Sequence, residues 1–443
     1  MANGKIFCNV PWFHLELRPN GSFEMCCNQT KEVDGYSAYH NDIYNIKQMS
    51  IKDWYNSDRM KSYRLKILGD TPIKECTYCY NDEKHGNESY RITHNWRSVI
   101  FTRDAFKDSF EQSPHYPIFH KSQSNGEYNG VPLDLHVSMG NECNLACKFC
   151  HPSLSTKIAS KYKIWSLLND KQSATRESWM DDDDTWLKFC NELLSFKHLR
   201  SVHFMGGEPT LSPRLEQFFD FFIDNKKTDF AVSFVTNGTK FCSRIISKMK
   251  KFQRADIDIS IESILDNNYY IRQGLKKEIY LNNVKQFLAA QSDNFFVTLK
   301  PVISALTIPT YPELIEYFFD NKIFTESNIC WSPEYLQVSV LPKSIRDTYI
   351  PKYERLLDKI SQSKNDNKSN LIQARSIDTL YHSLYNELNT AFNMLKSPEP
   401  SNAQNLQKQM VYWLAKWDKA FGLNAHDYYP DWSQFLNANG YQV

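Results

Sequence analysis

The sequence of 443 residues lacks the features that would place it in or through a membrane. No uninterrupted apolar stretch reaches the roughly 18 residues that a membrane-spanning helix needs. The N-terminus, MANGKIFCNVPW, has neither the charged start nor the apolar run of a signal peptide. We therefore expect a soluble chain in the cytoplasm, where thiols stay reduced, with no membrane partner.

An excess of charge of either sign is also missing. Lys and Arg number 52 and Asp and Glu number 51, so the formal net charge is +1. This balance argues against a protein that coats nucleic acid, and none is expected as a partner. Neither a repeat of fixed period nor a long low-complexity tract is present. The apolar content of 41% predicts a packed interior.

Cysteine is the residue that the sequence does supply. There are eleven, and eight of them precede residue 151, mostly in tight groups. In a reducing compartment such groups are more often metal ligands than disulfides. The later cysteines, Cys190, Cys242 and Cys330, stand alone and are predicted to be unreactive thiols, mostly buried.

Three parts differ in pattern. Residues 1–125 are rich in cysteine, aromatics and turns. They predict a small α+β module with a hairpin in FHLELRPNGSFEMCC that turns at Pro19–Gly21. The segment IKDWYNSDRMKSYRLKILG has helical spacing, and residues 112–130 are typical of a linker. Residues 342–443 are mostly amphipathic and predict a helical extension.

Between these parts, residues 126–341 alternate short apolar runs with amphipathic stretches. This pattern predicts parallel strands joined by right-handed helical crossovers. The fold class is therefore α/β, a partial (β/α)6 barrel of TIM type, with chemistry at the C-terminal strand ends. The acidic run 181–184 is predicted to begin a helix. The expected strands span residues 133–139, 201–205, 230–236, 256–261, 296–303 and 334–341.

A first cysteine group lies in GNECNLACKFCHP, just after a predicted strand. Soft thiolates such as Cys143, Cys147 and Cys150 hold iron–sulfur clusters, and three of them leave one iron without a protein ligand. Two other interpretations stay open. A zinc site would need a fourth ligand, for which His151 is the nearest candidate. The thiols could also be structural.

The segment CNLACKFC resembles the CxxxCxxC motif of the radical S-adenosylmethionine (SAM) superfamily. The resemblance implies that the three cysteines bind a [4Fe-4S] cluster whose open iron chelates the amino and carboxylate groups of SAM. It also implies reductive cleavage of SAM to methionine and a 5′-deoxyadenosyl radical, which removes hydrogen from a substrate. A low-potential electron donor, such as flavodoxin or ferredoxin, would then be a partner.

Further segments resemble that superfamily in the expected order. The GGEP turn would contact the SAM amino group, since its glycines let backbone approach a ligand closely. A carboxylate at Glu262 would bind the ribose, and Arg272 would pair with the SAM carboxylate. Phe149 would pack near adenine, or it is ordinary core. GGEP and TNG are also ordinary turns when taken singly. The resemblance assigns to SAM binding Phe149, Gly206, Gly207, Glu208, Pro209, Thr236, Asn237, Ser260, Glu262 and Arg272.

A second cysteine group precedes the barrel. The spacing Cys8-x12-Gly21-x4-Cys26 resembles the first half of the SPASM or twitch auxiliary-cluster domain. The CxxC pair Cys76 and Cys79 completes four ligands for one auxiliary [4Fe-4S] cluster, a relay or a structural element. Two departures are the N-terminal position and too few cysteines for two clusters. A zinc knuckle is the alternative, and Cys27 is a spare thiol or exchanges with Cys26.

The resemblance leaves the substrate open and assigns no catalytic acid or base. We expect an oxidoreductase that modifies or oxidises a peptide or protein. A twitch-type dehydrogenase of a small molecule is the second interpretation. A non-catalytic iron–sulfur or zinc-binding scaffold is the third, although the intact cysteine and glycine motifs speak against it.

Overall fold

The computed structural model describes residues 6–27, 43–84, 89–92, 94–95, 116–168, 176–363 and 377–443. The chain forms two compact units. The first comprises Met1–Asn144, Pro152–Val235 and Cys242–Asp256, and the second comprises Leu145–His151, Thr236–Phe241 and Ile257–Val443.

A sheet of seven strands, in the order β2-β1-β3-β5-β6-β7-β9, forms the core of the fold. Strands β1, β3, β5 and β6 run parallel, whereas β2 is antiparallel to β1. This confirms the expected α/β class with a parallel, partial-barrel sheet. The strands are β1 (His14–Leu17), β2 (Phe23–Glu24), β3 (Asp134–Ser138), β5 (Ser201–Met205), β6 (Ala231–Thr236), β7 (Arg254–Ser260) and β9 (Phe295–Lys300).

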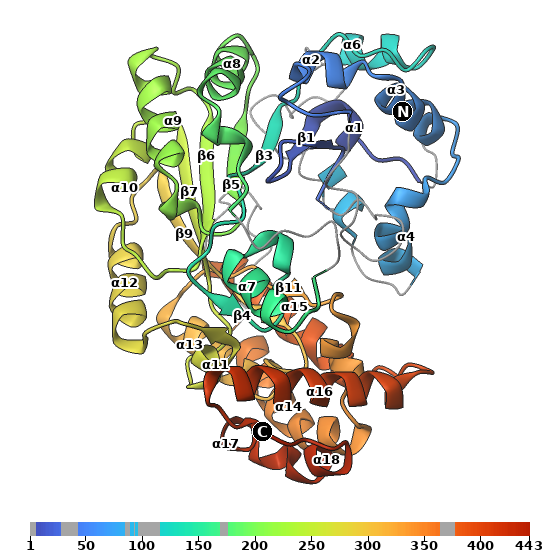
Figure 1. Ribbon diagram of the computed structural model, residues 1–443, viewed down its shortest axis with the longest axis vertical. Helices are drawn as coiled ribbons and strands as arrows, with labels where there is room; N and C mark the ends of the chain where they lie inside the picture. The colour runs from blue at the N-terminus through green and yellow to red at the C-terminus, as the bar shows by residue number, and fades with distance from the viewer. Residues whose placement is uncertain are drawn as a thin grey trace. The chain divides into compact units, whose positions relative to one another are not determined.

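The two faces of the sheet differ in the first unit because successive side chains of a strand point to opposite faces. On one face Phe204 is fully buried, and its ring lies 4.8 Å from that of Phe218 on α9. Figure 1 shows α8 and α9 beside β5 and β6. On the other face the alternate positions, His203 and Ser233, are only half-buried. His136 on β3 lies on this polar face beside His203, with 5.0 Å between ring centres.

The predicted hairpin is confirmed, since β1 pairs with β2 around Gly21. Gly21 has φ +89°, and a Cβ there would lie 2.9 Å from Asn45 Oδ1, so both conformation and space require glycine. The linker predicted at 112–130 is wrong in part, because Tyr116–Ser122 form helix α6. Proline at 117 is compatible with a first helical turn. Residues 112–115 lie outside the described residues.

The other helices of the first unit are short or cover the sheet. The acidic run does begin a helix: Asp182 caps α8 and accepts a hydrogen bond from Thr185 N. The helices are α1 (Val10–Phe13), α2 (Ile51–Tyr55), α3 (Asp58–Leu68), η2 (Lys74–Cys76), α4 (Thr77–Lys84), η4 (Pro152–Leu154), α7 (Thr156–Ile164), η5 (Trp179–Asp181), α8 (Asp183–Leu194), η6 (Pro209–Leu211), α9 (Pro213–Asp224) and α10 (Ser243–Met249).

In the second unit the strand expected at 334–341 is wrong. That segment forms two 3-10 turns, η7 (Glu334–Leu336) and η8 (Val338–Val340). Its alternating apolar residues are buried against helices α15 (Ile377–Lys396) and α16 (Ala403–Phe421), so they need no strand partner. The short strands of this unit are β4 (Ala146–Cys147) paired with β8 (Arg272–Gln273), and β10 (Val302–Ile303) paired with β11 (Asn328–Ile329).

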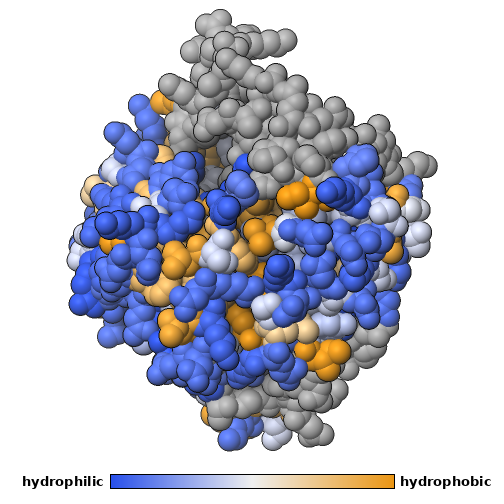
Figure 2. All heavy atoms as spheres, turned by 90° about the horizontal axis from the view of Figure 1, so that it is seen from above, coloured by the Kyte–Doolittle hydropathy of each residue, from blue (hydrophilic) through white to orange (hydrophobic). Residues whose placement is uncertain are grey.

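The helical C-terminal region is confirmed, and α14 packs along α15 in the second unit (Figure 1). Within the described residues, none of the helices is long and apolar enough to cross a membrane. The face drawn in Figure 2 is mostly hydrophilic with scattered apolar side chains. The remaining helices of this unit are α11 (Asn267–Ile271), α12 (Lys277–Ala289), α13 (Tyr311–Asn321), α14 (Lys343–Gln362), α15 (Ile377–Lys396), α17 (Ala425–Tyr428), η9 (Pro430–Trp432) and α18 (Ser433–Ala438).

Candidate active site and cluster-binding residues

The four cysteines expected to hold the auxiliary cluster are all buried and come together in the first unit. Burial raises the pKa of Cys26, and the neighbouring thiols raise it further, first that of Cys27 and then those of Cys76, Cys8 and Cys79. Burial likewise raises the pKa of Cys76 to about 12, with Cys79 as the next cause. Each thiol therefore lies within electrostatic reach of the others, as ligands of one metal centre must.

The spacing of these thiols bears on which metal centre they fit. A tetrahedral zinc ion with Zn–S bonds of about 2.3 Å would hold its four sulfur atoms roughly 3.8 Å apart. In the part of the chain that the structure describes, no three of these sulfur atoms lie within 4.8 Å of one another. A cluster of four irons carries its thiolates on separate corners and spaces them more widely. The thiols are therefore spaced more widely than the four ligands of a zinc knuckle.

Cys27, which was left without a role, lies beside the polar face of the sheet. Its side chain hydrogen-bonds to His136 on β3. Burial would lower the pKa of His136, but the hydrogen bonds with Cys27 and Glu16 raise it to about 9.

The GGEP turn contacts the segment that leads into Cys143. Gly207 N donates to Gly140 O at 2.9 Å, and Glu208 N donates to Glu142 O at 2.8 Å. A Cβ on Gly207 would lie 2.1 Å from Glu142 O. Glycine is therefore required here for packing as well as for any approach to a ligand. It lets the backbone of the GGEP turn contact the backbone that precedes Cys143. Two backbone hydrogen bonds then hold the segment just before Cys143.

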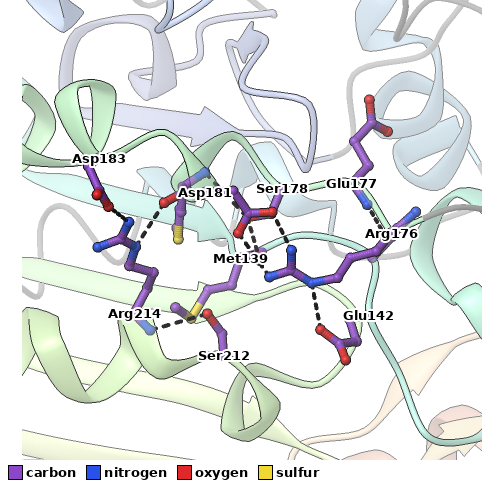
Figure 3. A network of polar contacts seen from close by, with 11 residues as sticks. Met139, Glu142, Arg176, Glu177, Ser178, Asp181, Asp183, Ser212 and Arg214 are labelled. Atoms are coloured by element: carbon purple, nitrogen blue, oxygen red, sulfur yellow. Dashed lines mark hydrogen bonds and ion pairs between the residues drawn. The ribbon is translucent and has the colours of Figure 1, made fainter.

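Side chains add to this junction. Glu208 Oε1 accepts from Thr210 N at 3.2 Å and from Thr210 Oγ1 at 2.7 Å, which caps the turn over Pro209–Leu211. Figure 3 shows Arg176 reaching both Glu142 and Asp181. Because Arg176 is 41% exposed, each of these pairs contributes at most about 1 kcal/mol. A small cavity beside them is lined by Met139, Gly140, Glu142, Arg176, Glu177, Ser178, Gly207, Glu208 and Ser212.

Gly207→Ala is expected to disrupt this junction. The added methyl group meets a backbone carbonyl, which cannot rotate away, so the two segments must separate and Cys143 moves with them. We expect iron to fall from about eight to about four per chain, measured on anaerobically reconstituted protein. Gly440→Ala is the control, since a Cβ there meets nothing within 4 Å, and its φ of +79° shows what backbone strain away from the junction does to the iron content. An unchanged iron content in Gly207→Ala would contradict this explanation.

In the second unit, Cys147 and Arg272 are paired residues of β4 and β8. Arg272 Nη1 donates to Glu262 Oε1 at 3.0 Å, and Glu262 Oε2 accepts from Val302 N at 3.0 Å. Burial lowers the pKa of Arg272, but Cys147 and Glu262 raise it more. Burial raises the pKa of Glu262, and Arg272 opposes this.

One hydrogen-bond donor of Arg272 is not used in its pair with Glu262. Among the described residues, the buried Arg272 Nε has no hydrogen-bond partner. A buried donor of this kind fits an anionic ligand group such as the SAM carboxylate, because an unsatisfied buried polar atom is costly. Arg272 thus has a carboxylate partner from the protein and, among the described residues, a donor without a partner, and it lies opposite Cys147, a predicted cluster ligand.

The other predicted SAM contacts sit at strand ends, as expected. Thr236 Oγ1 accepts from Gly238 N at 3.2 Å, and Asn237 Oδ1 accepts from Thr239 N at 3.0 Å. Ser260 O accepts from the Tyr280 hydroxyl at 2.9 Å. These bonds shape local turns. Phe149 is half-buried between Lys148 and Cys150. Their roles in SAM binding stay predictions.

Sequence reasoning missed a buried ion pair inside the cysteine motif. Lys148 Nζ lies 2.8 Å from Asp418 Oδ1 on α16 and 4.0 Å from the centre of the Tyr270 ring. The hydroxyls of Tyr270 and Tyr441 donate to Asp418 Oδ2 at 2.9 and 2.7 Å. Burial lowers the pKa of Lys148, and Asp418 opposes this. No local pattern signals this pair, since its members are 270 residues apart.

The other single cysteines behave as expected: Cys190, Cys242 and Cys330 are buried. Cys330 Sγ contacts Ser332 O at 3.5 Å.

Comparisons with known proteins point the same way. Residues 137–317 match the Radical SAM superfamily, and residues 8–80 match an iron–sulfur cluster-binding domain of SPASM type. No curated protein matches the chain. Among solved structures, anSMEcpe with bound AdoMet is 18% identical with a TM-score of 0.40, over 52% of this chain and 60% of that one. The chain thus spans about 60% of the length of that protein.

A second solved structure is that of Streptococcus suis SuiB bound to S-adenosylmethionine. It is 15% identical with a TM-score of 0.36, over 70% of this chain and 65% of SuiB. SuiB has also been solved with its precursor peptide SuiA. On the family matches over residues 137–317 and 8–80, this chain carries a radical SAM domain and an auxiliary iron–sulfur cluster-binding domain, which imply SAM, a SAM-binding [4Fe-4S] cluster and an auxiliary cluster as cofactors.

Proposed function

We propose that the enzyme removes hydrogen from a peptide or protein substrate, and that Cys143, Cys147 and Cys150 hold the cluster that binds SAM. When bound and reduced, that cluster supplies the electron that cleaves SAM to methionine and a 5′-deoxyadenosyl radical. The functional parts we propose are residues 1–125 for the auxiliary module, 126–341 for the barrel and 342–443 for the helical extension.

The observation that carries this proposal is the set of four mutually close, buried thiols in the N-terminal module. Four protein thiolates leave no iron open for a substrate, so this centre suits electron transfer and a net oxidation. Burial excludes water from Cys8 and Cys26, which protects a cluster from solvent. Electrons would come from a low-potential donor such as flavodoxin or ferredoxin, in the reducing cytoplasm.

The polar face of the sheet supports a polar substrate. Half-buried His203 and Ser233 offer hydrogen-bonding groups on neighbouring strands, and His203 Nδ1 lies 2.7 Å from Ser233 Oγ. A peptide backbone presents donors and acceptors to such groups. The same groups could bind the hydroxyls of a small alcohol, so a dehydrogenase of a small molecule is the second candidate.

Deuterium transfer separates these candidates. The reconstituted enzyme is incubated anaerobically with SAM, dithionite and a fully deuterated extract of its source cells, divided into peptide-protein and small-molecule fractions. We expect 5′-deoxyadenosine to gain deuterium, read by mass spectrometry, from the peptide-protein fraction alone. Deuterium from the small-molecule fraction alone would establish the dehydrogenase. Unlabelled 5′-deoxyadenosine with both fractions would contradict hydrogen abstraction from either class.

A further inference from the structure

We propose that His14, Glu16 and His136 bind a single zinc ion on the polar face of the sheet, separate from the iron–sulfur clusters. One ligand atom from each of these side chains lies within 4.8 Å of those of the other two. In the described part of the chain, they are the one set of three or more such side chains with that spacing. The site lies wholly in the first unit and does not depend on the proposed substrate.

Strand pairing brings the three residues together. His14 and Glu16 are two apart on β1, so their side chains share a face of the sheet. Strand β1 pairs in parallel with β3, and in this register Glu16 lies opposite His136. The rings of His14 and His136 are 4.5 Å apart between centres. The backbone pairing of β1 with β3 therefore fixes the positions of the three side chains that would bind the metal ion.

Burial without hydrogen bonds is the second observation. His14 is 1% exposed and Glu16 is 0% exposed. Among the described residues, both ring nitrogens of His14 have no hydrogen-bond partner, and the carboxylate oxygens of Glu16 have only long ion-pair contacts of 3.4 Å with Arg18 and His136. Buried polar atoms are nearly always satisfied, so a fully buried imidazole without a partner beside a buried carboxylate requires an explanation. A bound cation would satisfy atoms of all three residues together.

The charged groups around Glu16 offer an alternative to a bound metal ion, because they could neutralise its carboxylate themselves. Arg18 Nη1 lies 3.4 Å from Glu16 Oε1, and Arg18 Nη2 lies 2.5 Å from Glu24 Oε2. His136 Nδ1 lies 3.4 Å from Glu16 Oε2. Arg18 is thus bound more closely by Glu24 than by Glu16. A protonated His136 with Arg18 could neutralise Glu16 without metal, and the experiment below distinguishes this state.

The donor set favours zinc. Two imidazoles and one carboxylate hold zinc with a fourth position open, and the same set in an octahedral site holds iron(II). Here other rings crowd the site: His94 lies 5.3 Å from His14, and His203 lies 5.0 Å from His136, between ring centres. Crowding by these rings favours four-coordinate zinc over an octahedral ion. The side chain of Cys27 also contacts His136.

The test uses the anaerobically reconstituted holoenzyme, equilibrated with Zn²⁺ and then desalted. We expect one zinc per chain besides the cluster iron. X-ray absorption at the zinc edge should show nitrogen and oxygen neighbours at about 2.0–2.1 Å. In Glu16→Gln the zinc should fall at least tenfold while iron stays unchanged. Glu24→Gln, which alters the neighbouring partner of Arg18, should keep the zinc.

His136→Gln provides a second variant if Glu16→Gln does not fold, because His136 is partly exposed. It should also lose zinc and keep iron. Three outcomes would overturn the proposal. These are a wild-type enzyme without zinc, a zinc shell of sulfur at about 2.3 Å, which would place the ion on cysteines, and equal zinc in wild type and both variants. Iron bound by nitrogen and oxygen in place of zinc would overturn the choice of metal.

Discussion

Cys147→Ala is expected to abolish the formation of 5′-deoxyadenosine from SAM, whereas Cys76→Ala is expected to leave some formation and to block substrate turnover. Cys147 is one of only three thiolates in its motif, and two cannot hold a [4Fe-4S] cluster firmly. It also faces Arg272 across β4 and β8, so its loss disturbs the donor that we assign to the SAM carboxylate. Cys76 belongs to the separate group of thiols. The measurement is anaerobic incubation with SAM and dithionite, followed by chromatography.

Iron analysis must accompany this comparison. The wild type should hold about eight irons per chain, and each variant about four. Cys190→Ala is the matched control, because this single thiol is fully buried in α8 and belongs to neither group. Equal 5′-deoxyadenosine from wild type and Cys147→Ala would contradict the assignment of the SAM-binding cluster. Full turnover by Cys76→Ala would contradict a relay through the auxiliary cluster.

Asp418→Asn is expected to lower the free energy of unfolding by about 3 to 5 kcal/mol, because it leaves a buried ammonium without its counter-ion. Lys148 and Asp418 have side chains 1% and 0% exposed, so solvent cannot replace the lost charge. Since Lys148 lies between Cys147 and Cys150, we also expect iron to fall toward four per chain. Denaturant unfolding and iron analysis provide the two measurements.

Asp427→Asn is the control for this variant, since Asp427 is exposed on the neighbouring helix α17. The double variant Lys148→Met with Asp418→Asn removes both charges and should recover part of the lost stability. If Asp418→Asn were as stable as Asp427→Asn, the ion pair would not hold the cysteine loop in place.

Much of the barrel could be predicted because its strands carry their own signal. Strands β3, β5, β6, β7 and β9 begin within two residues of the expected positions, since buried parallel strands are short apolar runs. The segment 334–341 shows the limit of this rule. Alternating Leu336, Val338 and Val340 are buried as in a strand, but helix packing provides that burial and no ladder forms.

The residues of the candidate site also differ in how far they could be predicted from the sequence. Motifs within a few residues of each other, such as Cys143 to Cys150 and the GGEP turn, could be found because one short segment holds them. The zinc-site residues could not, since nothing in FHLEL indicates that β1 pairs with β3 about 120 residues later. Lys148 looks like a solvated residue in sequence, and only α16 reveals its partner. Long-range pairing of polar residues leaves no periodic pattern to detect.

The buried pair of Lys148 with Asp418 also sets an order for biogenesis. The loop that carries two of the SAM-cluster cysteines belongs to a unit completed by residues 257–443, and Tyr441 is among the groups that hold Asp418. A nascent chain on the ribosome has no counter-ion for Lys148 until α16 has emerged. The four N-terminal cysteines belong to a unit that is complete at residue 256. We therefore expect the auxiliary centre to be able to form before the SAM-binding one, which waits for the C-terminal helices.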